Sequence, residues 1–120
     1  MVADPFADRL ARVRDRFAIT LAGKIEETCA AVPQLSHVAP SAAAAVADTY
    51  RSVHGMVGVG PTVGFPATGK AARDVEIALR KAQQERRGLT DDEIELLTEK
   101  LQVLRAVAAR ELRPFHTVEP

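Results

Sequence analysis

The sequence predicts an all-α protein, an antiparallel four-helix bundle with a long N-terminal helix. Four stretches carry apolar residues at spacings of three and four, short segments separate them, and no stretch alternates apolar and polar residues as a strand would. There is no Trp, one Tyr and four Phe, so Ala, Leu, Val and Ile must build the core, which suits closely packed helices. We expect one domain over residues 1–120, with an ordered core of about residues 4–113.

The first predicted helix begins near Pro5, which suits the first helical position, with Asp4 as a candidate cap. Val32-Pro33 is expected to end it, because proline interrupts helical hydrogen bonding. One face carries its apolar residues: Phe6, Leu10, Val13, Phe17, Leu21, Ile25 and Cys29.

The second predicted helix follows a loop over residues 33–40, opens near Ser41 and ends at Gly60-Pro61, with residues 61–65 as the turn. Its expected inward face consists of Ala42, Ala45, Val46, Thr49, Val53 and Met56.

The third helix can begin at Pro66 and is expected to end at Arg86-Arg87-Gly88. Thr90 and Glu93 form a capping box that begins the fourth helix, and Pro114 is expected to end it. The apolar face of the third helix comprises Ala71, Val75, Ala78, Leu79 and Ala82. That of the fourth helix comprises Ile94, Leu97, Leu101, Leu104, Val107 and Leu112.

The charge balance excludes several classes of partner. Sixteen basic residues balance sixteen acidic ones, so nothing draws the chain as a whole to nucleic acid or to a membrane. A single cysteine, Cys29, excludes an internal disulfide and fits a reducing compartment. No apolar run reaches 18 residues, and the N-terminus lacks the pattern of a signal peptide. We therefore expect a cytoplasmic protein.

The most informative stretch surrounds His54, where Gly55, Gly58 and Gly60 fall within six positions of a helix. Each interior glycine costs a helix about 1 kcal/mol relative to alanine. A helix that simply ends at Gly60-Pro61 explains Gly60 but not the other two glycines. We interpret the glycines as leaving the imidazole bare for a second protein; the alternative is a helix histidine without a role.

The pattern His54-x-Met56-x-Gly58, followed by Gly64-Phe65-Pro66 and Ala72-x-x-Val75-Glu76, resembles the histidine-containing phosphotransfer (HPt) family over the central third of the chain. The resemblance implies a four-helix bundle that works as a phosphoryl carrier, rather than an enzyme, in a two-component phosphorelay.

In this resemblance His54 is the phosphoacceptor, through Nε2. It takes the group from an aspartyl-phosphate on a response-regulator receiver domain and passes it to another receiver. Met56 then takes the place of a buried apolar residue, and Gly58 of the small residue that lets the receiver approach. The implied partners are receiver domains or a hybrid histidine kinase. The resemblance implies no cofactor in this chain, with Mg²⁺ in the receiver.

One departure concerns charge. The family often has a lysine three residues after the histidine, where this chain has Val57. Arg51, one turn before His54, could supply a cation for a phosphorylated ring, as could Lys70 or Arg73 of the third helix. Val57 also leaves open a second function, a degenerate HPt-like bundle that binds partners without being phosphorylated.

Other patterns favour simpler interpretations. Residues 64–71 nearly match a P-loop, but Ala71 replaces the Mg²⁺-binding hydroxyl and no strand precedes Gly64. His37 and His116 have no ligands at metal-binding spacing. Glu76 fits the HPt pattern, yet a surface helix residue is a simpler interpretation. Dimerisation through the first helix is compatible with either function.

Overall fold

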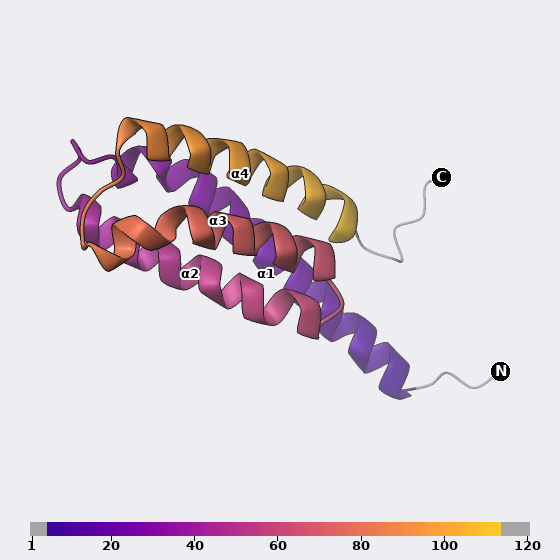
Figure 1. Cartoon of the computed structure of the whole chain (residues 1–120). Helices are drawn as coiled ribbons and strands as arrows, with labels where there is room; N and C mark the ends of the chain where they lie inside the picture. Colours follow the sequence, from indigo (N-terminus) through magenta and orange to yellow (C-terminus); the bar gives the residue numbers. More distant parts are fainter. Residues whose placement is uncertain (1–4, 114–120) are drawn as a thin grey trace.

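The computed structural model describes residues 5–113 and contains four helices in this range. They are α1 (Pro5–Leu35), α2 (Ala42–Thr62), α3 (Pro66–Gln84) and α4 (Asp91–Glu111). Each helix packs against two neighbours, α1 against α2 and α4, and α3 against the same two (Figure 1). The predicted all-α four-helix bundle is thus confirmed.

The core lies along the axis of the bundle and is built almost entirely from aliphatic side chains. Val46 and Val53 of α2, Val75 of α3 and Leu97 of α4 are fully buried. Apart from half-buried Ala45 and Ala78, the predicted inward faces of α2 and α3 are buried. Because β-branched and leucine side chains fill this space, the helix carrying His54 is held rigidly.

The N-terminal turns of α1 extend beyond the other helices (Figure 1). The predicted apolar face of α1 therefore divides into two parts. Leu21 and Ile25 are buried in the core, whereas Phe6 is 62% exposed, Leu10 54% and Val13 42%. The sequence periodicity was uniform along the face, but only its second half has other helices to cover it.

Two predicted helix ends are wrong, since proline does not stop either helix. The α1 helix continues through Pro33 to Leu35, and α2 continues through Pro61 to Thr62. At the first site the chain gains tertiary contacts, because Leu35 is fully buried and its C=O accepts the N–H of Leu89 at 2.7 Å. These contacts outweigh the one helical hydrogen bond that a proline removes.

The α2–α3 turn requires glycine at two kinds of position. Gly64 has φ +96°, which side chains with a Cβ rarely adopt. Gly60 is buried against α3: a Cβ there would lie 3.1 Å from the C=O oxygen of Phe65 and 3.2 Å from Cα of Gly69. The α2 and α3 helices approach this closely because neither Gly60 nor Gly69 has a side chain.

The α3–α4 connection also differs from expectation. The α3 helix ends at Gln84, and the left-handed residue after it is Arg86, with φ 54°, rather than Gly88. Gly88 serves packing, because a Cβ there would lie 2.7 Å from Cα of His37. The predicted capping box is confirmed, with Thr90 accepting the Glu93 N–H and the Glu93 carboxylate accepting the Thr90 N–H.

The expected cap Asp4, the stop Pro114 and His116 lie outside the described residues. Within residues 5–113, no helix has the length and hydropathy together that a membrane-spanning segment requires.

Candidate functional site

His54 stands on the outer side of α2, six residues before Gly60, the last buried residue of that helix. Val53 and Met56 on either side of it in sequence are 0% and 1% exposed and fix the rotation of the helix. The His54 side chain is 70% exposed as a result. The structure thus places the predicted phosphoacceptor in solvent on a rigid element.

A buried carboxylate on α3 contacts the imidazole of His54. Glu76 of α3 contacts His54 through Oε2 and Nδ1, and the Glu76 side chain is only 4% exposed. The interpretation of Glu76 as a surface residue is therefore wrong. The helix spacing alone could not reveal this, because the packing of α2 on α3 decides which face of α3 is covered.

The contact selects one tautomer of the ring. A carboxylate can only accept a hydrogen bond, so in the neutral imidazole the proton resides on Nδ1. The lone pair is then on Nε2, the nitrogen on the far side of the ring from Glu76. Nε2 is the atom that the resemblance assigns as the nucleophile.

Tyr50, which the sequence analysis gave no role, packs beside the imidazole. The two rings are nearly parallel, with an interplanar angle of 11° and centroids 6.3 Å apart. Tyr50 precedes His54 by four residues, and helical side chains tilt toward the N-terminus, so this contact follows from spacing. The aromatic residue four positions before His54 could therefore have predicted this ring contact from the sequence.

The opposite side of the ring is open. A Cβ added at Gly55 or at Gly58 would have no atom within 4 Å outside the local helix backbone. A side chain at position 58 would lean back over His54, because it lies one turn further along α2. The two glycines thus serve no internal packing, unlike Gly60, and leave one side of His54 accessible.

The three candidate cations and Val57, which replaces the family's lysine, occupy different positions. Arg51 forms an ion pair with Asp48 at 2.7 Å, so its guanidinium already has a partner. Val57 is half-buried and packs against the core. Lys70 and Arg73 are exposed on α3. Lys70 precedes Glu76 by six residues and Arg73 precedes it by three.

Helix geometry separates the two α3 cations. Since α2 and α3 run antiparallel and Glu76 is level with His54, Arg73 is level with Val57, the position where the family often has lysine. Arg73 also lies close to Glu76 around α3, whereas Lys70 is a further turn away.

A groove between α1 and α2 adjoins this site. It has a volume of about 210 Å³ and includes Arg51, Ser52 and Gly55 on the α2 side. Phe17, Leu21, Met56 and Val59 supply apolar surface in it, and Lys24 is the cation on the α1 side. It provides contact surface next to His54.

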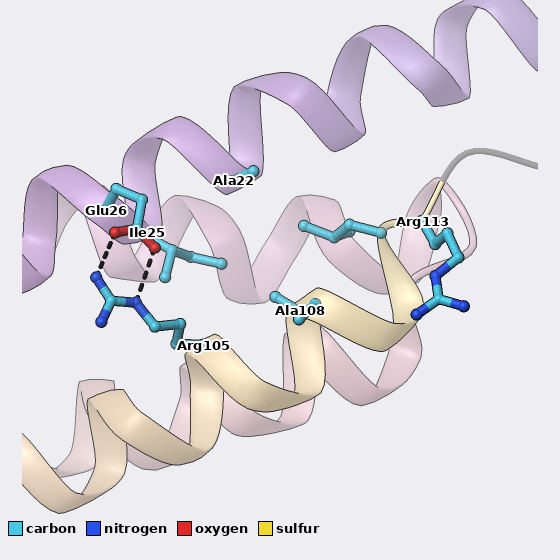
Figure 2. A pocket seen from close by; sticks show the side chains of 8 residues that line it. Ala22, Ile25, Glu26, Arg105, Ala108 and Arg113 are labelled. Carbon is cyan, nitrogen blue, oxygen red and sulfur yellow. Dashed lines mark hydrogen bonds and ion pairs between the residues drawn. The ribbon is translucent and has the colours of Figure 1, made fainter. Parts of the chain in front are cut away.

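A larger groove of about 370 Å³ lies between α1 and α4 (Figure 2). Ala22, Ile25 and Ala108 line it, and at one end Arg105 Nε donates to Glu26 Oε2 at 2.8 Å. This contact lowers the pKa of Glu26. A paired ion and apolar walls make it a packing groove rather than a reactive site.

Across residues 5–113, no group of three or more His, Cys, Asp or Glu residues could hold a metal ion. His37 lies 3.4 Å from Asp91, and Cys29 is half-buried, with burial raising the pKa of its thiol. The chain matches no protein-family model, no curated protein and no solved structure. Its function must be argued from the His54 site.

Proposed function

We propose that this chain is a histidine phosphotransfer protein of a two-component phosphorelay, with His54 as the phosphoacceptor. One observation carries the proposal: an exposed imidazole whose Nδ1 is bound to the buried carboxylate of Glu76. A histidine that only filled a surface position would have no need of a desolvated carboxylate, which is costly to bury.

The chemistry is a displacement at phosphorus. The Nε2 lone pair attacks the phosphorus of an aspartyl-phosphate, the acyl P–O bond breaks, and the aspartate leaves as a carboxylate. The ring gains positive charge as the N–P bond forms, and Glu76 stabilises that charge at Nδ1–H. Transfer to a second receiver reverses these steps with a new aspartate as the nucleophile.

Most of the catalysis belongs to the partner in this scheme. A receiver domain supplies the aspartate and Mg²⁺, and this chain supplies an oriented nucleophile on a stiff helix. The open space over Gly55 and Gly58 admits the receiver's acidic pocket. We expect Arg73, which is exposed and level with Val57, to neutralise the transferred group. Arg51 is less suited to this role, because its guanidinium pairs with Asp48.

A degenerate, non-phosphorylated interaction module is the second candidate. Val57 favours it, because an apolar half-buried residue stands where the family often has a cation. In that case the surface around His54 binds a receiver domain, and Glu76 only fixes the shape of that surface.

Phosphorylation tests the two candidates directly. Wild-type chain is treated with ammonium phosphoramidate, a small phosphoryl donor, and separately with phosphorylated receiver domains. We expect one acid-labile, alkali-stable phosphate, absent from His54→Gln and retained in His37→Gln, which removes another exposed histidine. No label from either donor on folded protein, together with receiver binding, would support the interaction module.

Glu76→Gln tests the role of the carboxylate. The amide keeps the shape of the side chain but can present its NH₂ to Nδ1 and cannot offset positive charge. We expect the rate of transfer from a receiver to fall by about tenfold or more, with the ¹⁵N chemical shifts of His54 reporting a changed tautomer population. An unchanged rate would remove Glu76 from the mechanism.

A further inference from the structure

The N-terminal part of α1 presents apolar side chains that the described bundle does not cover. Arg14 stacks on the ring of Phe65 with its Cζ 5.0 Å from the centroid, so the end of the bundle at the α2–α3 turn is level with Arg14. About nine residues of α1 precede that level, some 14 Å of helix at 1.5 Å per residue. We call residues 5–17, which comprise this part and the turn that joins it to the bundle, the α1 overhang.

The apolar stripe of the overhang is continuous with the core. Phe6, Leu10 and Val13 follow one another at spacings of four and three, and Phe17, four residues on, packs against the core and lines the α1–α2 groove. The stripe therefore lies on the side of α1 that packs against the bundle further along the helix. We call the stripe of the overhang, together with the adjoining end of the bundle, the step.

Charge is segregated around this stripe. At about 100° per residue, Arg9 and Arg16 fall on one border of the stripe and Arg14 on the other. Asp8 and Asp15 fall on the opposite side of the helix. Arg113, at the end of α4, adds a further cation near this end of the bundle (Figure 2). Although the whole chain is electrically neutral, the step is basic.

The Glu111 carboxylate at the bundle end attracts Arg14, which lies on the border of the stripe away from Arg9 and Arg16. Glu111 accepts the backbone N–H groups of Ala67 and Thr68 at 2.9 and 2.6 Å, at the beginning of α3. An occupant of the step must therefore combine apolar residues, to cover the stripe, with carboxylates, to meet the border arginines.

A second copy of the chain fits poorly. Antiparallel pairing of two overhangs would set Arg9 and Arg16 against the same two residues of the copy, and parallel pairing would set them against its Arg14.

A flat membrane surface also fits poorly, despite the basic amphipathic character of the overhang. A plane that covered the stripe would meet the end of the bundle, which lies on the same side of α1. A partner helix of about 10 Å diameter can instead lie along the stripe, as a neighbouring helix of the bundle does.

We propose that the α1 overhang binds an acidic amphipathic helix of another protein, with Asp or Glu residues bordering its apolar face. This inference is independent of phosphotransfer at His54. The partner helix would continue the packing that α2 and α4 provide along the rest of α1, and carboxylates on its borders would pair with Arg9 and Arg16.

The test uses the full chain and a synthetic, fluorescein-labelled peptide of roughly four turns, with leucines on one face and glutamates at its borders. Fluorescence anisotropy measures binding at low and at raised salt. One control peptide has lysine in place of glutamate, and a second has the same composition without a segregated apolar face. We expect binding of the acidic amphipathic peptide only, weakened by salt.

Variants locate the surface. We expect Arg9→Glu and Leu10→Gln each to weaken binding by about tenfold or more. Arg12→Glu makes the same change in charge on the outer side of the helix and should alter binding by less than about threefold. All three residues are exposed, and circular dichroism with urea unfolding confirms that the variants remain folded.

Several results would overturn the proposal. These are no binding of the acidic peptide at concentrations up to about 1 mM, equal binding of the lysine peptide, or equal losses from Arg9→Glu and Arg12→Glu. Leu10-dependent binding to phosphatidylglycerol vesicles without peptide binding would assign the overhang to a membrane. A Leu10-dependent dimer in sedimentation equilibrium would assign it to a second copy.

Discussion

At the scale of single residues, the glycines of α2 have opposite functions although they are alike in sequence. Gly60 permits close packing on α3, since a Cβ there would lie 3.2 Å from the backbone N and Cα of Gly69. Gly55 and Gly58 have open space instead, so they weaken the helix without any gain in packing. This contrast can be measured.

Alanine at these positions should change stability in opposite directions. We expect Gly58→Ala to raise the free energy of unfolding by about 0.5–1 kcal/mol, because alanine favours the helix and nothing obstructs its methyl group. Gly60→Ala should lower it by about 1–3 kcal/mol, because the backbone of α3 must shift. Urea unfolding followed by circular dichroism measures both.

A larger side chain at position 58 separates stability from function. We expect Gly58→Leu to fold stably and to slow transfer from a receiver domain, because the side chain leans over His54. If Gly58→Leu transferred as fast as the wild type, the open space over His54 would have no part in docking.

At the scale of elements, the beginning of α3 depends on a side chain from another helix. The residue before α3, Phe65, makes no side-chain cap. Glu111 of α4 accepts the N–H groups of Ala67 and Thr68 and supplies negative charge at the positive end of α3. Burial raises the pKa of Glu111, but the hydrogen bonds from Thr68 and Ala67, together with the charge of Arg14, outweigh it, so the net shift is downward.

Loss of this carboxylate should destabilise the bundle through α3. We expect Glu111→Ala to lower the free energy of unfolding by about 1–2 kcal/mol, since two N–H groups lose their acceptor. Glu99→Ala, an exposed glutamate of the same helix, should change it by less than about 0.5 kcal/mol. Equal effects would show that the cap makes no net contribution. Chemical denaturation at neutral pH makes the comparison.

At the scale of the whole molecule, the two loops at the end away from the α1 overhang hold the helix pairs together. The Leu89 N–H donates to the Leu35 C=O, and the His37 N–H donates to the Leu89 C=O at 2.9 Å. Arg87 reinforces this end by donating to both Glu93 carboxylate oxygens, at 2.7 and 3.0 Å. The hydrogen bonds from Arg87 lower the pKa of Glu93 to about 2.

The stability of the molecule should therefore depend on pH in the acidic range. Because the pKa of Glu93 is lower in the folded state than the ordinary 4.5, its contribution is complete above that value and is lost as the pH falls toward 2. We expect Glu93→Gln to lower the free energy of unfolding by about 1–2 kcal/mol near pH 7.

The same variant should lose less stability than the wild type when both are acidified from above pH 4.5 toward pH 2, as urea midpoints would record. Glu95→Gln, at an exposed position of α4, is the control and should follow the wild type. Parallel acid profiles for wild type and Glu93→Gln would contradict this account.

Much of this protein could be predicted from local sequence. Apolar spacings predicted four helices and most inward positions of α2, α3 and α4. The Thr90 capping box predicted the start of α4, and the glycines around His54 indicated its exposure. Each of these features depends only on a residue and its neighbours within about two helical turns. Helix geometry alone determines how such neighbours lie relative to one another.

Tertiary structure decided what depends on a second helix. It determined that Glu76 is buried under His54, that Glu111 caps α3, and that α1 passes through Pro33 while its first turns remain uncovered. Helical periodicity shows which residues share a face, but the arrangement of the other helices determines which part of that face is buried. For this reason the exposed histidine could be predicted from the sequence, whereas the buried carboxylate that contacts it could not.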